Sequence, residues 1–122
     1  MKLREVVEIL SAEVLCGENS VDGIEIQNGY ASDLMSDVLA FASPYVLLLT
    51  GLTNIQIFRT AQMLDIPAIV FVRDKTPQEN LLVLAKESEM PILVTKSSMF
   101  DACGKLYANG LLPCIIPDRQ GG

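Results

Sequence analysis

Hydroxyl, amide and carboxylate side chains gather in the short segments that follow the predicted strands of this sequence, a placement that suits ligand binding. In an α/β protein the carboxyl ends of parallel strands meet at one edge of the sheet, and the helices that begin there favour anions at their amino ends. The polar residues that fall at this edge are Ser32, Asp33, Ser36, Thr50, Gly51, Thr53, Asn54, Thr95, Ser97 and Ser98. As a set, they predict a site for the phosphate or ribose of a nucleotide, or for another small phosphorylated metabolite.

Each of these residues also has a purely structural explanation. Serine, threonine, aspartate and asparagine are the residues that most often cap the amino ends of helices. The sequence predicts such caps at Ser32 or Asp33, at Thr53 or Asn54, and at Ser97 or Ser98. Capping and ligand binding therefore both remain open at these positions.

Charged residues at the same edge offer further chemistry. Asp33 and Asp37 are four residues apart, so on a helix they share one face and could supply two ligands to Mg²⁺ or an acid/base pair. The segment Arg73-Asp74-Lys75 follows another predicted strand. Because no third metal ligand accompanies the aspartates, we interpret their helix face as solvated surface. We likewise interpret Arg73-Asp74-Lys75 as a solvated turn rather than an anion clamp. A Mg²⁺-dependent phosphotransferase is accordingly the third choice of function.

The familiar catalytic signatures are missing from the sequence. It contains no GxxxxGK[ST] phosphate loop, no GxGxxG fingerprint, no GxSxG nucleophile turn and no CxxC pair. It has no histidine, which excludes histidine catalysis, ligation and pH switching. Cys16, Cys103 and Cys114 match no metal or redox spacing and are predicted to be reduced, buried thiols. We therefore predict that the protein is not an enzyme and has no cofactor or metal.

Hydrophobic periodicity predicts the elements that position this edge. Strands are expected at residues 13–16, 24–30, 45–50, 68–72 and 90–95, and helices at residues 3–10, 33–41, 54–64, 78–87 and 98–107. Successive strand–helix units between residues 45 and 109 require right-handed crossovers. The fold class is therefore α/β, with a mainly parallel sheet of about five strands and the two short amino-terminal strands at an edge.

Composition limits the partners. The net charge is −6, and the nine lysines and arginines are scattered singly, so neither nucleic acid nor an anionic membrane surface is an expected partner. No apolar stretch approaches the length of a membrane-spanning helix, and the amino terminus does not resemble a signal peptide. These features predict a cytoplasmic protein.

The length of 122 residues predicts one domain, residues 1–111, followed by an extended carboxyl-terminal tail, residues 112–122. Leu111, Leu112, Ile115 and Ile116 follow the last predicted helix and would be exposed in an isolated domain. They predict a homodimer interface.

Three parts of the sequence resemble the DRTGG domain family. The first is Gly29–Leu39, GYASDLMSDVL; the second is Thr50-Gly51 ahead of Thr53-Asn54-Ile55; the third is Thr95 with Ser98-Met99-Phe100 and Gly104-Lys105-Leu106-Tyr107. The resemblance covers residues 2–111. At the two turns that carry the family's name, this sequence has Thr50-Gly51-Leu52 and Val72-Arg73-Asp74 instead.

The resemblance implies a three-layer fold with helices on both faces of the sheet, similar to the amino-terminal domains of HPr kinase/phosphorylase and of the Mur ligases. The family also occurs beside CBS domains in regulated pyrophosphatases and in phosphotransacetylases, as a regulatory or dimerising module. It implies a non-catalytic regulatory domain here, without the P-loop kinase domain. The alternative, from a different class, is a protein–protein adaptor that binds no small ligand.

Overall fold

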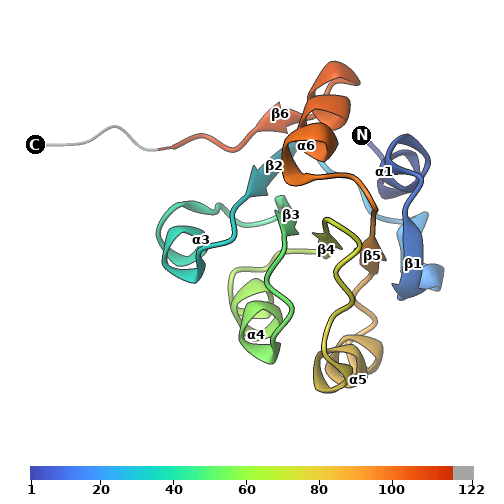
Figure 1. Cartoon of the computed structure of the whole chain (residues 1–122), viewed down its shortest axis with the longest axis vertical. Helices are drawn as coiled ribbons and strands as arrows, with labels where there is room; N and C mark the ends of the chain where they lie inside the picture. The colour runs from blue at the N-terminus through green and yellow to red at the C-terminus, as the bar shows by residue number, and fades with distance from the viewer. Residues whose placement is uncertain (117–122) are drawn as a thin grey trace, which may run out of the picture.

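A six-stranded sheet with the order β1-β5-β4-β3-β2-β6 forms the centre of the computed structural model, which describes residues 1–116 (Figure 1). The strands are β1 (Glu13–Cys16), β2 (Asn28–Ala31), β3 (Leu47–Thr50), β4 (Ala68–Phe71), β5 (Ile92–Val94) and β6 (Leu112–Pro113). All neighbouring strands from β5 to β6 are parallel, whereas β1 pairs with β5 in the antiparallel direction. The predicted mainly parallel sheet is confirmed, with β1 as its antiparallel edge. The expected edge position of the second strand is wrong, because β2 lies between β3 and β6 and is parallel to both.

Helices cover both faces of the sheet, as expected for a three-layer α/β fold (Figure 1). They are α1 (Leu3–Leu10), α2 (Glu18–Val21), α3 (Met35–Phe41), α4 (Ile55–Met63), α5 (Glu79–Glu87) and α6 (Met99–Ala108). One core cluster contains buried residues of α3, α4 and α5, and the other contains buried residues of α1 and α6. Within residues 1–116, no helix is both long enough and apolar enough to cross a membrane.

The central strands β3 and β4 are buried at every position because both of their faces are covered, and all of their residues except Thr50 are apolar. In β3, Leu47 and Leu49 enter the core beneath α1 and α6, while Leu48 enters the core beneath α3, α4 and α5. The same alternation holds in β4, where Ile69 and Phe71 pack on the side opposite to Val70. The two-residue repeat of a strand thus divides a continuous apolar run between two cores.

The second predicted strand is displaced in the structure. We expected it at residues 24–30, but β2 is Asn28–Ala31. The Leu3 amide donates to the Ile24 carbonyl (2.9 Å), and the Ile26 amide donates to the Met1 carbonyl (2.6 Å). The alternation of Ile24 and Ile26 therefore reflects pairing with the amino terminus rather than a place in the main sheet. Between β1 and β2, residues 18–21 form the short helix α2.

The carboxyl-terminal part crosses the sheet from β5, over α6, to the far side of β2 (Figure 1). Gly110 has a φ of 104°, and the Gly110 and Leu111 amides donate to the Tyr107 and Leu106 carbonyls at 3.1 and 3.0 Å. This is a Schellman cap, in which the left-handed glycine ends the last helix. Of the predicted tail, Leu112–Pro113 pairs with β2 as β6, and residues 117–122 lie outside the described part.

Candidate functional site

The loops after β2, β3, β4 and β5 lie at one edge of the sheet because these four strands run parallel and adjacent to one another. Backbone hydrogen bonds join the loops. The Ser32 amide donates to the Leu49 carbonyl (3.1 Å), and the Val72 amide donates to the Thr50 carbonyl (3.0 Å). We call this region, residues 32–37, 50–54, 72–75 and 95–98, the carboxyl edge.

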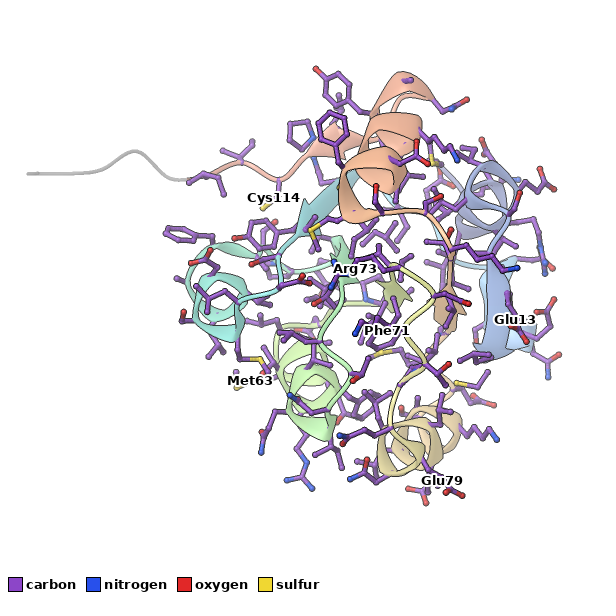
Figure 2. The ribbon with its side chains drawn as sticks, viewed as in Figure 1. Glu13, Met63, Phe71, Arg73, Glu79 and Cys114 are labelled. Carbon is purple, nitrogen blue, oxygen red and sulfur yellow. The ribbon has the colours of Figure 1, made fainter. Side chains whose placement is uncertain are left out.

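Asp33 is the residue that connects three of these loops. Its Oδ1 accepts a hydrogen bond from the Gly51 amide (2.5 Å), and its Oδ2 lies 3.0 Å from Nη2 of Arg73. The Arg73 side chain, which follows β4, thus extends towards the end of β3, as Figure 2 shows. Both side chains remain roughly two-fifths exposed, at 41% for Arg73 and 45% for Asp33, so the pair borders solvent.

Arg73 stands on a tight turn with an uncommon backbone conformation. Arg73 and Asp74 have φ values of 58° and 56°, and the Lys75 amide donates to the Val72 carbonyl (3.2 Å). Left-handed conformations are unfavourable for residues with a side chain, so they require support from their surroundings. That support comes from the segment that follows β5: the Arg73 amide donates to the Ser97 carbonyl and the Asp74 amide to the Thr95 carbonyl, both at 2.8 Å.

Gly51 is required beneath the arginine. A Cβ atom at this position would lie 2.0 Å from Nη2 of Arg73 and 3.0 Å from Oδ1 of Asp33. The missing side chain therefore lets the guanidinium lie against the backbone at the end of β3. As a result, a backbone N–H donor and a positively charged guanidinium lie beside each other at the surface, a pair that suits an oxyanion.

The predicted cap at Asp33 is wrong, and this correction has a clear physical reason. The N-cap of α3 is Leu34, and no side chain caps it. The Asp33 carboxylate is instead engaged with Gly51 and Arg73. Ser32 forms a local turn in which its Oγ accepts from the Leu34 amide (3.0 Å). Arg73 lies on a solvent-exposed turn, as expected, and its guanidinium also pairs with Asp33.

The other predicted caps are confirmed in two cases. The Asn54 side chain accepts a hydrogen bond from the Ile57 amide (3.3 Å) at the start of α4. The Ser98 side chain accepts from the Asp101 amide (3.1 Å) at the start of α6. Both residues therefore have a structural role at the carboxyl edge, whatever else they contact.

Two of the predicted site residues are buried. Thr50 is fully buried, and its hydroxyl accepts from the Leu52 amide (3.1 Å). The Thr95 hydroxyl donates to the Leu10 carbonyl (2.9 Å) and accepts from the Ser97 amide (3.3 Å). These hydroxyls point into the protein and shape the loops rather than present a polar group to solvent.

The remaining predicted residues lie around the pair formed by Asp33 and Arg73. Ser36 is exposed on α3, and the Thr53 carbonyl accepts from the Gln78 amide (3.0 Å). Lys105 donates to the Ser97 hydroxyl (3.4 Å) and pairs with Asp101 at 3.0 Å. Within residues 1–116, no group of three or more cysteine, aspartate or glutamate residues is placed to hold a metal ion.

Two hollows lie away from the carboxyl edge and differ from it in chemistry. One, of about 180 Å³, lies between α6, β2 and β6 and has a mainly apolar lining that includes Cys103, Leu106, Tyr107 and Leu112. Burial raises the pKa of the Cys103 thiol.

The second hollow, of about 510 Å³, lies at the opposite edge of the sheet beside Asp65 and Glu89. Its two carboxylates would repel an anion, so the carboxyl edge suits a phosphate better.

Comparison with solved structures finds a likeness of fold. The chain superposes on the CBS and DRTGG domains of the regulatory region of a Clostridium perfringens pyrophosphatase, a structure complexed with its activator, diadenosine tetraphosphate. The TM-score is 0.65 at 16% sequence identity, over 98% of this chain and 51% of that one, so the chain spans about half the length of the structure it matches. No protein-family model and no curated protein matched the sequence.

This match confirms, at the level of the fold, the DRTGG-like domain that the sequence resemblance implied. The three-layer α/β architecture is confirmed with it.

Proposed function

We propose that this chain is a non-catalytic regulatory domain that binds a nucleotide or another small phosphorylated metabolite at its carboxyl edge. The observation that carries the proposal is the Gly51 amide beside the Arg73 guanidinium, because this pair of donors fits a phosphate oxygen. A solved structure of similar fold belongs to a regulatory region and was determined with a nucleotide activator, which supports the same ligand class.

Surrounding residues extend the proposed site. Lys75 and Lys96 are exposed on the neighbouring loops and add positive charge to a chain whose net charge is −6. Ser32, Ser36, Thr53, Asn54 and Ser97 line the same edge and supply hydroxyl and amide groups suited to a ribose or to further phosphate oxygens. We add Arg73 to the residues predicted from sequence, as the anchor of the phosphate.

The test is a thermal-shift titration with diadenosine tetraphosphate, ATP and sugar phosphates, each with and without Mg²⁺. Ligand at about 100 times its Kd stabilises a folded domain by about 2.7 kcal/mol, which is several degrees in Tm for a domain of this size. Arg73→Ala should abolish the shift. Arg59→Ala removes an exposed arginine from α4 and should leave the shift unchanged. If none of these compounds stabilises the wild-type protein, the proposed ligand class is wrong.

We also propose that the domain forms a homodimer, through the outer face of α6. Phe100, Cys103, Gly104 and Tyr107 have the spacing of one helix face, and Phe100 and Tyr107 are 91% and 67% exposed. This face is complementary to itself: a second α6 packed antiparallel would set Phe100 against Tyr107 and Cys103 against Gly104. A Cβ atom at Gly104 would meet no other atom within 4 Å, which leaves room for close approach. Two-fold dimers use such self-matching surfaces.

Sedimentation velocity over a range of concentrations tests the dimer. Phe100→Ser should shift the protein towards monomer, whereas Val83→Ser, at an exposed apolar position on α5, should not. A wild-type protein that stays monomeric at high concentration would refute this part of the proposal.

The second candidate function is a protein–protein adaptor without a small ligand. The observation in its favour is the exposure of the apolar side chains of Leu112, Ile115 and Ile116. The expected exposure of Leu111 is wrong, because Leu111 is buried in the core beneath α1 and α6. Deleting this segment is a poor test, because it would remove β6 and the buried Cys114 from the fold. Ile115→Ser, at an 85% exposed position, is the sharper variant: it should weaken an adaptor's partner binding and leave nucleotide binding unchanged.

A further inference from the structure

The Asp33 carboxylate occupies the position that an oxyanion of a ligand would take at the carboxyl edge. We propose that Asp33 is a built-in competitor: it closes the anion site formed by the Gly51 amide and the Arg73 guanidinium, and a phosphoryl group binds by displacing it. This inference rests on the proposed function and assigns its regulation. Each carboxylate oxygen satisfies one of the two donors, Oδ1 that of Gly51 and Oδ2 that of Arg73.

The backbone that carries the two donors is held in place independently of Asp33. The Arg73 backbone is fixed by the hydrogen bond from its amide to the Ser97 carbonyl, and the next amide is bound to Thr95. Gly51 directly follows β3, and its missing Cβ keeps the space for the guanidinium. Removing the aspartate should therefore leave the Gly51 amide and the Arg73 backbone in position, so that the amide and the guanidinium remain available to another anion. Preorganised donors are what an anion site requires.

The competitor, by contrast, lies next to a helix start that no side chain caps. Asp33 directly precedes Leu34, the N-cap of α3, and no side chain caps that helix. Aspartate is among the best residues for accepting hydrogen bonds at the first turn of a helix. A displaced Asp33 carboxylate can therefore turn to the start of α3. The same side chain has two places to go, and binding of an anion shifts it from one to the other.

Charge also favours the exchange. A carboxylate carries one negative charge, while a phosphoryl group near neutral pH carries about −1.5 to −2 and has three acceptor oxygens. The exposed Lys75 and Lys96 on the adjoining loops add cationic charge around the site. A polyphosphate can engage more of these groups than Asp33 does. A ligand with a single carboxylate has no such advantage over it.

The experiment titrates wild-type protein, Asp33→Ala, Arg73→Ala and the double variant with inorganic phosphate, using calorimetry and the amide NMR signal of Gly51. Apparent affinity falls in proportion to the fraction of molecules whose site is open. If Asp33 closes the site in about nine molecules of ten, Asp33→Ala should bind phosphate about tenfold more tightly than wild type. Arg73→Ala should lose binding, with or without Asp33, and circular dichroism should report an intact fold for every variant.

The matched control is Asp37→Ala, which removes the same charge from α3 without touching the Gly51 amide or Arg73. Asp37→Ala should bind phosphate with the same affinity as wild type. A general effect of removing one negative charge would instead tighten phosphate binding in both aspartate variants. Equal or weaker phosphate binding by Asp33→Ala than by wild type overturns the competitor proposal. If wild type then still binds diadenosine tetraphosphate through Arg73, the proposed function survives. Tighter phosphate binding by Asp33→Ala, with no nucleotide bound by wild type, upholds the competitor and refutes the proposed ligand.

Discussion

Asp33 and Arg73, forty residues apart in the chain, meet at the carboxyl edge of the sheet with Oδ2 and Nη2 3.0 Å apart. Asp33 follows β2 and Arg73 follows β4, so their contact passes over Gly51 at the end of the strand between them. Neither residue belongs to a regular element. The ion pair is exposed, and such pairs contribute little to folding. Its geometry is therefore better explained by the proposed anion site than by stability.

Gly51→Ala should impair binding at the carboxyl edge while leaving the fold nearly intact. The new methyl group would lie 2.0 Å from Nη2 of Arg73, the end of a flexible and exposed side chain that can move aside. We expect the free energy of unfolding to change by less than about 1 kcal/mol, as at most surface positions. Gly51→Ala should bind phosphate more weakly than wild type, as Arg73→Ala should. Urea unfolding and calorimetry measure the two effects separately.

Alanine substitutions at two other glycines provide reference values for the stability change of Gly51→Ala. Gly17 has a φ of 78°, and a Cβ there would lie 2.5 Å from the Cα of Pro91, which is backbone and cannot move aside. Gly17→Ala should therefore destabilise the protein by more than about 1 kcal/mol. Gly104→Ala, in α6 with open space around it, should stabilise it by up to about 1 kcal/mol through helix propensity. If Gly51→Ala destabilises the fold as strongly as Gly17→Ala, our expectation that the Arg73 side chain moves aside for the new methyl group is wrong.

Thr95→Val should destabilise the protein without weakening phosphate binding. Valine matches the shape of threonine but removes the hydroxyl that bonds the Leu10 carbonyl and the Ser97 amide. Leaving buried polar partners unsatisfied costs about 1–3 kcal/mol. Thr95→Ser keeps the hydroxyl and should recover part of this loss. Chemical unfolding of the three proteins makes the comparison, and loss of phosphate binding in a folded Thr95→Val would show that Thr95 belongs to the site after all.

The central elements were predictable because their patterns are local. A run such as Tyr45–Thr50 is apolar at nearly every position only when both faces of a strand are covered, and the caps at Asn54 and Ser98 need only nearby residues. The contact between Asp33 and Arg73 was not predictable in the same way. An aspartate can serve either as a helix cap or as a partner in a long-range ion pair. Which of the two Asp33 does depends on the strand order, which no local sequence pattern contains.

The amino-terminal region shows the same limit. Ile24 and Ile26 alternate as a strand should, yet their partner is the segment around Met1 and Leu3 rather than the main sheet. An alternating pattern reports one buried face and leaves the identity of the neighbour open. Hydrophobic periodicity alone predicted only the α/β class. The resemblance to the DRTGG family added the three-layer fold.

Acid should weaken the link between α1 and α2. Arg4 pairs with Asp22 (2.9 Å) and Glu18 (2.9 Å), and its hydrogen bond lowers the pKa of the Asp22 carboxyl. A carboxyl whose pKa is lower in the folded state adds stability above its ordinary pKa of about 3.9 and loses it as the pH falls through the folded value. Asp22→Asn should therefore be less stable than wild type at pH 7, with the difference vanishing in strong acid.

Urea unfolding at several pH values measures this difference. Glu8→Gln is the matched control, since it removes a carboxylate from α1 that is not one of Arg4's two partners. Salt should diminish the effect of Asp22→Asn at pH 7, because the pair is at the surface. A difference between wild type and Asp22→Asn that persists unchanged at low pH would contradict the assigned role of the ion pair.

The three thiols should react with a maleimide in a fixed order. Cys103 is partly exposed beside the apolar hollow at α6, whereas Cys16 and Cys114 are buried. Burial raises the pKa of the Cys103 thiol above its ordinary value of about 8.5, and the thiolate is the reactive form. At concentrations that keep the protein monomeric, Cys103 should therefore react first but more slowly than a free thiol, and its rate should keep rising above a pH of about 8.5. Peptide mapping after short exposures measures each site, and early modification of Cys16 would show that its surroundings are more open than the structure has them.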